Sequence, residues 1–138
     1  MSTSTYCMKT PFFITLIFLF ALTACTRTAI DNIAGKGGNA TLRVVPKHHN
    51  VHKNIINAKV YIKYNAQDAT TVFDDSADCI MVNGVSTASF NGLKKGNYYL
   101  MSRGYDSSIN QSVKGGIPYT IKEEVSLDIV VPVTETHL

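Results

Sequence analysis

Three histidines lie close together in the stretch KHHNVH, at positions 48, 49 and 52. Neutral imidazole is a good ligand for zinc and copper, so His48, His49 and His52 are candidate metal ligands. Along an extended strand, however, His48 and His49 would point to opposite faces, and His52 would oppose His49 as well. Only a turn could gather them, and Asn50 favours a turn. The alternative is a solvated loop between two strands, because no fourth zinc ligand is evident nearby.

Carboxylates gather in FDDSAD, which contains Asp74, Asp75 and Asp78. Calcium binds several carboxylates, and the loops of β-sandwich domains are able to hold it. The segment lacks the fixed alternation and the central glycine of the familiar calcium loop. An acidic surface loop is the alternative interpretation.

Nucleophilic catalysis finds little support in the sequence. Cys79 precedes Ile80, Met81 and Val82 in a predicted strand, where a free cysteine behaves as a small buried hydrophobe. There is no G-x-S-x-G elbow, no H-E-x-x-H helix and no phosphate-binding glycine loop. An enzyme would need a histidine from 48–52 beside an aspartate from 74–78. We therefore predict no enzyme, no catalytic residues and no cofactor.

Carbohydrate binding is a further possibility, because Tyr61, Tyr99 and Tyr105 could present aromatic rings near the surface. The polar segment 104–112 could supply hydrogen bonds, although ordinary turn chemistry explains it equally well. The chain has no tryptophan, the usual platform for stacking sugars. Its formal net charge of +3 is too small and too evenly spread to indicate a nucleic-acid partner.

The first 24 residues are typical of a secretory signal: a polar start with Lys9, an apolar run from Phe12 to Leu22, and small residues before Cys25. Leu22-Thr23-Ala24-Cys25 resembles a bacterial lipobox, which implies that Cys25 carries acyl chains after cleavage. Two or three such chains, at about 0.8 kcal/mol for each buried methylene, hold a domain at a membrane. An ordinary signal peptide cut after Ala24 is the alternative.

Three segments follow from this interpretation: a signal peptide at 1–24, the lipidated cysteine with a flexible tether at 25–39, and one domain at 40–138. The tether contains three glycines and no periodicity. Thr26 and Arg27 directly after the cysteine are not acidic, which by analogy with enterobacterial lipoproteins favours the outer membrane. Since Cys79 then has no partner, the core depends on packing and not on disulfides.

From residue 40 onwards apolar and polar residues alternate with a period of two. In Asn57–Tyr64, residues 58, 60, 62 and 64 would lie on one face of a strand, and Lys59, Tyr61 and Lys63 on the other. Residues 125–133 alternate in the same way. Asn83-Gly84 favours a tight hairpin between 79–82 and 85–90. Seven short strands with turn residues between them predict an all-β domain, a single β-sandwich.

The segment SFNGLKKGNYYLMSRGYD contains Phe90, Leu93, Gly96 and Tyr98, which fit F-x-x-L-x-x-G-x-Y. This pattern resembles the signature of carboxypeptidase regulatory-like domains, which are transthyretin-like sandwiches. The resemblance implies that Leu93 fills the core, that Gly96 turns the chain and that Tyr98 begins the next strand. The overall sequence also resembles small uncharacterised lipoproteins of Bacteroidetes.

The resemblance implies a binding or accessory role, because no catalytic domain accompanies the sandwich. We therefore expect a membrane-anchored, non-catalytic envelope lipoprotein that acts as an interaction module, with another envelope protein as its partner. A carbohydrate-binding or metal-ion-binding lipoprotein is the alternative.

Overall fold

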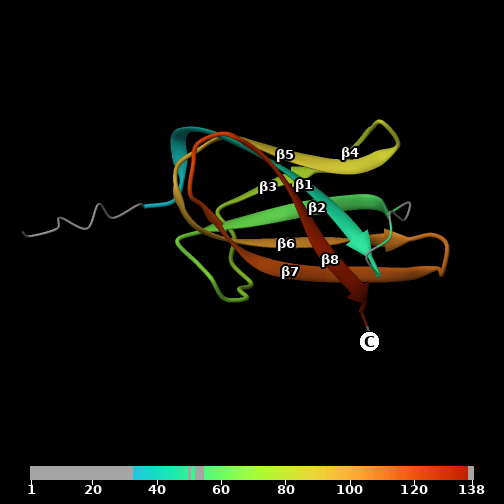
Figure 1. Ribbon diagram of the computed structural model, residues 1–138. Helices are drawn as coiled ribbons and strands as arrows, with labels where there is room; N and C mark the ends of the chain where they lie inside the picture. Colours follow the sequence, from blue (N-terminus) through green and yellow to red (C-terminus); the bar gives the residue numbers. More distant parts are fainter. Residues whose placement is uncertain (1–32, 50, 52–54, 137–138) are drawn as a thin grey trace, which may run out of the picture.

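The computed structural model describes residues 33–49, 51 and 55–136 (Figure 1). Their regular structure consists of strands, which confirms the predicted all-β class. The strands are β1 (Lys36–His48), β2 (Ile55–Tyr64), β3 (Asp75–Asp78), β4 (Ile80–Val82), β5 (Val85–Leu93), β6 (Gly96–Asp106), β7 (Gln111–Ile121) and β8 (Ser126–Glu135). No helix long and apolar enough to cross a membrane occurs among these residues. The predicted signal peptide, the lipidated Cys25 and His52 lie outside the described residues.

The eight strands form one mixed sheet in the order β3-β2-β6-β7-β8-β1-β5-β4. The first strand and the last strand are parallel neighbours, with His48 opposite Val133, whereas the other neighbours are antiparallel. The sheet curls, so that β2 and β3 from one end of this order lie against β5 from the other. Figure 1 shows β8 crossing between the β4–β5 side and the β6–β7 side.

The strand count differs from the expected seven because Asp75–Asp78 forms β3, where an acidic loop was the interpretation. This short strand pairs only with β2, at an edge of the sheet, so its side chains need not follow an apolar pattern. At the other end of the domain, β1 begins at Lys36, which is four residues before the expected domain boundary. Ala34 is already buried in the core.

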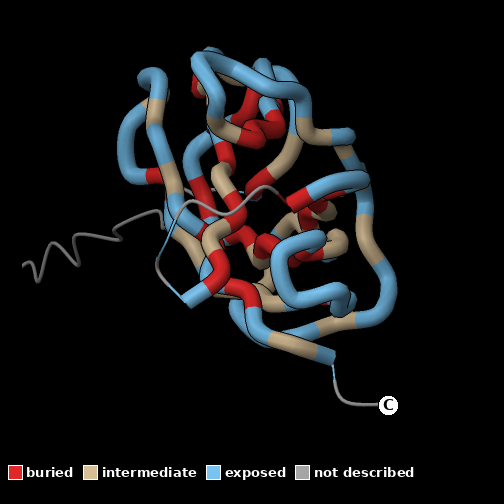
Figure 2. The backbone as a smooth tube through the Cα atoms, turned by 90° about the vertical axis from the view of Figure 1, so that its right-hand side faces the viewer, coloured by how far each residue is buried: buried red, intermediate tan, exposed pale blue. Residues whose placement is uncertain are grey.

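The core forms where the alternating apolar side chains of the strands meet inside the curled sheet. Figure 2 shows the buried residues along the backbone gathered toward the interior, with exposed residues around them. Val60 and Ile62 are fully buried on β2, as the period of two predicts. The residues of the family-like motif are also buried: Phe90, Leu93, Gly96 and Tyr98. The Tyr98 hydroxyl donates to the Lys94 carbonyl at 2.7 Å and accepts from the Gly35 N–H at 3.0 Å. This tyrosine therefore ties the start of β1 to the β5–β6 turn.

Candidate metal centre

The two adjacent histidines are brought together by a turn at the end of β1. His48 is the last residue of the strand, and its carbonyl accepts a hydrogen bond from the Val51 N–H at 3.0 Å. His49 has a φ of 48°, in the left-handed region, so the chain changes direction there. The two imidazole rings consequently lie with their centroids 4.2 Å apart. The opposed arrangement expected for an extended strand does not occur, because the strand ends before His49.

His48 is held by a carboxylate from the end of β6. Its Nδ1 lies 2.7 Å from Oδ2 of Asp106, and both side chains are buried. The other oxygen of Asp106 accepts from the Ser108 hydroxyl at 2.5 Å and from the Ser108 N–H at 2.8 Å. The Ser108 hydroxyl, together with the His48 imidazole, lowers the pKa of Asp106 from 3.8 to about 2.

The partner of Nδ1 determines where His48 carries its proton. An ionised carboxylate only accepts hydrogen bonds, so Nδ1 of His48 is the donor to Asp106. In the neutral ring, Nε2 then carries a free lone pair. That atom is buried and has no hydrogen-bond partner among the described residues. A buried polar atom without a hydrogen-bond partner lowers the folding stability by about 1–3 kcal/mol. The unpaired Nε2 of His48 therefore needs a physical explanation.

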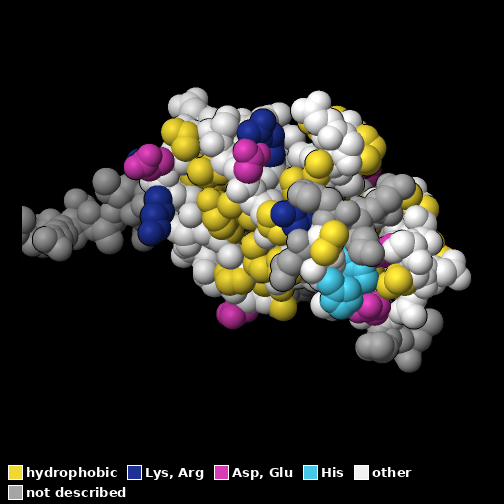
Figure 3. All heavy atoms as spheres, turned by 45° about the vertical axis from the view of Figure 1, so that its right-hand side comes forward, with side chains coloured by type: hydrophobic (Ala, Val, Ile, Leu, Met, Phe, Trp, Pro, Cys, Tyr) yellow, Lys and Arg dark blue, Asp and Glu magenta, His cyan; other side chains and the backbone are white. Residues whose placement is uncertain are grey.

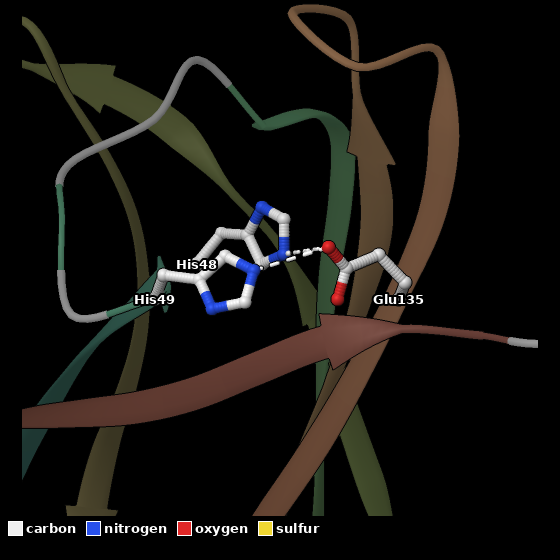
Figure 4. A group of neighbouring side chains, drawn as sticks. All are labelled: His48, His49 and Glu135. Carbon is white, nitrogen blue, oxygen red and sulfur yellow. Dashed lines mark hydrogen bonds and ion pairs between the residues drawn. The ribbon is translucent and has the colours of Figure 1, made fainter.

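Glu135 completes the group from the end of β8. Because β1 and β8 run parallel, their carboxyl ends meet at the same edge. Oε1 of Glu135 lies 3.3 Å from Nε2 of His48 and 3.0 Å from Nε2 of His49 (Figure 4). The backbone N–H of Glu135 itself and then the His49 imidazole lower the pKa of this carboxyl from 4.5 to about 2. Two imidazole nitrogens and one ionised oxygen thus converge.

The distances between the converging atoms fit a small metal ion. His48, His49 and Glu135 each offer one donor atom, and these atoms all lie within 4.8 Å of one another. Zinc binds nitrogen at about 2.0–2.1 Å, which in a tetrahedron separates neighbouring ligand atoms by about 3.3 Å. The distances of 3.0 and 3.3 Å from Oε1 to the two nitrogens are close to that value. The two nitrogen–oxygen distances are therefore compatible with ligands of one zinc ion.

The site is closed on one side and open on the other. The His48 side chain is 1% exposed, whereas the His49 side chain is 62% exposed and that of Glu135 26%. On the surface, histidine side chains lie beside an acidic group (Figure 3). Three protein ligands with access to solvent are typical of open metal sites, which keep a position for water or another ligand.

The other candidate residues are not brought to this site. Asp74, Asp75 and Asp78 form ion pairs with Lys63, Lys36 and Lys59 respectively. In the part of the chain that is described, these aspartates do not belong to a metal-ligating group. The histidine–aspartate pair that an enzyme would have needed thus joins His48 to Asp106, and not to the 74–78 segment.

Cys79 packs against the core as a half-buried side chain. Burial raises the pKa of its thiol, although a hydrogen bond from Ser86 opposes that change. A raised pKa keeps the thiol protonated and unreactive near neutral pH. The interpretation of Cys79 as a small hydrophobe agrees with this environment.

Two residues of the site, Asp106 and Glu135, were not found by sequence reasoning. The stretch Asp106-Ser107-Ser108 carried a usable signal, since aspartate followed two residues later by serine favours a side-chain–backbone turn. No sequence signal marked Glu135, because its position beside the two histidines depends on the parallel pairing of β1 with β8. No protein-family model, curated protein or solved structure matches the chain.

Proposed function

We propose that this protein is a lipid-anchored envelope protein whose β domain binds a divalent transition-metal ion through His48, His49 and Glu135. The observation that carries the proposal is Nε2 of His48, a buried nitrogen that lies 3.3 Å from a carboxylate oxygen and makes no hydrogen bond with a described residue. A cation between these two atoms removes their repulsion and gives the nitrogen a partner.

The donor atoms decide the class of metal. Two imidazole nitrogens with one carboxylate oxygen suit zinc, copper or nickel, whereas calcium and magnesium prefer oxygen ligands alone. Asp106 is the outer partner that metal-binding histidines usually have. A proton on Nε2 is the competing way to satisfy the same atom, and the two explanations differ in whether a metal binds.

A chelator-competition titration of the full-length protein in detergent with Zn²⁺ tests the proposal. We expect one Zn²⁺ per chain, with no competition from Mg²⁺ or Ca²⁺. His49→Asn removes the imidazole and keeps a residue that tolerates the left-handed backbone, and Glu135→Gln removes the charge. Each should weaken binding at least about tenfold. Asp128→Asn is the matched control, an exposed carboxylate of β8 that is paired with Arg43. Absence of binding, or equal affinity in all variants, contradicts the proposal.

The anchor is proposed from the lipobox-like sequence that ends at Cys25. Lipidation with palmitate would hold the domain at a membrane, and the absence of an acidic residue at Thr26 and Arg27 favours the outer membrane. We expect Cys25→Ser to lose labelling by radioactive palmitate and to move from the membrane pellet to the soluble fraction. Unchanged labelling and unchanged sedimentation would contradict the anchor.

We also propose that the domain is a transthyretin-like sandwich related to carboxypeptidase regulatory-like domains. Support comes from the motif residues Phe90, Leu93 and Tyr98, which are buried in the core. An experimental structure with the sheet split into two facing layers would agree with this relationship. A closed barrel would contradict it.

An interaction role is the second candidate function, and it is favoured by the edge strand β4. Ile80, Met81 and Val82 are all exposed there, and the sequence from Cys79 to Leu93 contains no charged residue. Natural sheets usually protect such edges with charge. We propose that an uncharged extended strand of another envelope protein pairs with β4.

Crosslinking in the producing cells, followed by mass spectrometry, tests the interaction role. Met81→Lys places a charge on the exposed edge without disturbing the core. We expect a stoichiometric partner with the wild-type protein and none with Met81→Lys. Val72→Lys is the control, because Val72 is equally exposed but lies outside the strand. The same crosslinks in all three proteins would contradict a role for β4.

A further inference from the structure

The outer face of β2, β6 and β7, which we name the tyrosine face, carries the side chains that alternate with the core. Its register places Tyr61 opposite Met101, and Met101 opposite Gly116. Residues that are directly opposite across two strands share a face of the sheet. The three tyrosines that could present aromatic rings therefore lie on this one face: Tyr61, Tyr99 and Tyr105.

A hollow of about 420 Å³ lies on the tyrosine face, which is within the size range of small-molecule sites. Its lining includes Thr70, Tyr99, Met101, Lys114, Gly116 and Thr136. Gly116 makes room for the Tyr99 side chain at the hollow, since a Cβ atom there would stand 2.6 Å from the Tyr99 hydroxyl. The hollow thus combines an aromatic ring, an apolar thioether, hydroxyl groups, a cation and, at its border, the carboxylate of Glu135.

Two cations beside the hollow have no ion-pair partner among the described residues, whereas the Glu135 carboxylate in its lining lies against His48 and His49. Arg103 and Lys114 are direct cross-strand neighbours, an arrangement in which like charges repel. Neither forms an ion pair with a described residue, whereas Lys59 and Lys63 on the same face are paired with Asp78 and Asp74. The Arg103 guanidinium lies 4.8 Å from the centre of the Tyr61 ring, which holds it on this face. An anion from outside would relieve the repulsion.

We propose that the hollow binds an acidic saccharide. The carboxylate of the sugar is attracted by Lys114 and Arg103, the apolar face of its ring packs on Tyr99 and Met101, and its hydroxyls meet Thr70 and Thr136. A bare anion would use only the two cations. A neutral sugar would leave those cations unpaired.

The site is separate from the metal centre in its chemistry, although Glu135 borders both. Glu135 pairs with Val113, which is buried, whereas Lys114 pairs with Thr134, which is exposed. The two sites therefore lie on opposite faces of β7 and β8. Experiments in the presence of EDTA separate them, because the saccharide does not need the metal.

Amide chemical-shift mapping of the full-length protein in detergent with EDTA tests the proposal. The probes are trigalacturonate and 3′-sialyllactose, with maltotriose as the neutral sugar and acetate as the bare anion. We expect both acidic probes to shift the amides of Tyr99, Met101, Lys114 and Gly116. Lys114→Ala should weaken their binding at least tenfold, whereas Lys59→Ala, the paired lysine of the same face, should leave it unchanged.

The following results of the same experiments would overturn the proposed saccharide site. No shift with either acidic probe at millimolar concentration overturns the proposal. Equal affinity for maltotriose removes the role of the cations, and the same shifts with acetate alone remove the role of the sugar ring. Binding that is unaffected by Lys114→Ala places the ligand elsewhere. Each of these four results overturns the proposal.

Discussion

Asp106 sets the direction of His48 at the end of β1. Its carboxylate is fixed by Ser108 on one oxygen and receives the Nδ1–H of His48 on the other. The ring is thereby held in one orientation, with Nε2 toward Glu135 and His49. Metal-binding histidines depend on such partners for both orientation and basicity.

The first prediction concerns Asp106→Asn, which keeps the size of the side chain and removes its charge. We expect the affinity for Zn²⁺ to fall about 10- to 100-fold, because the imidazole loses its ionised partner. Chelator competition measures the change, and Asp128→Asn again serves as the control. An unchanged affinity with Asp106→Asn would mean that Asp106 does not support the site.

The second prediction concerns acid stability. Asp106 has a pKa of about 2 in the folded protein against an ordinary 3.8. A lowered folded-state pKa contributes stability that is complete above the unfolded value and is lost as the pH falls through the folded value. Since the Ser108 hydroxyl is the largest cause, Ser108→Ala should be less stable than the wild type above about pH 4, with a difference that shrinks toward about pH 2. Urea unfolding across this range measures it, and a constant difference would contradict this origin.

At the scale of the elements, the glycines show where strands approach closely. Gly84 lies in the β4–β5 turn with a φ of 80°, and a Cβ atom there would meet nothing within 4 Å. Gly38 lies in β1, and a Cβ atom there would stand 2.2 Å from the Leu93 carbonyl oxygen. The first glycine serves the backbone of the turn, and the second serves the packing of β1 on β5.

The third prediction follows from this contrast. Gly84→Ala should cost about 1 kcal/mol, which is the price of left-handed backbone for a residue with a Cβ atom. Gly38→Ala should cost about 3 kcal/mol or more, because the clash is with backbone and requires β1 to move. Thermal unfolding of the two variants measures both changes. Similar losses would show that β1 has more room than the structure gives it.

Sequence reasoning succeeded where one strand carries its own pattern. Val60 and Ile62 could be assigned to the core because their neighbours on β2 are polar. It missed β3, whose residues Asp75–Asp78 are held in place by pairing with β2 and not by an apolar pattern. It also missed Glu135, because the pairing of β1 with β8 leaves no local trace in either strand. What could not be predicted is long-range pairing, on which the candidate metal centre depends.

At the scale of the whole molecule, the metal centre should contribute to stability. A ligand that binds only the folded state at 100 times its Kd adds about 2.7 kcal/mol. For a domain of this size, that is a rise in Tm of about 10 °C or more. We expect this rise when the full-length protein is heated with excess Zn²⁺, and we expect none with EDTA or with His49→Asn. An equal rise with His49→Asn would place the stabilising ion at another site.

The parallel pairing of β1 with β8 also has a consequence for the time at which the protein folds. β1 lies inside the sheet, between β5 and β8, and β8 is synthesised after the other seven strands. The sheet of the domain therefore cannot be completed before β8 has been synthesised. His49 and Glu135 are 86 positions apart, so an ion held between them closes a very long loop. A bound metal ion stabilises a fold most when it closes a long loop. The ion would thus keep β1 and β8 from separating once folding is complete.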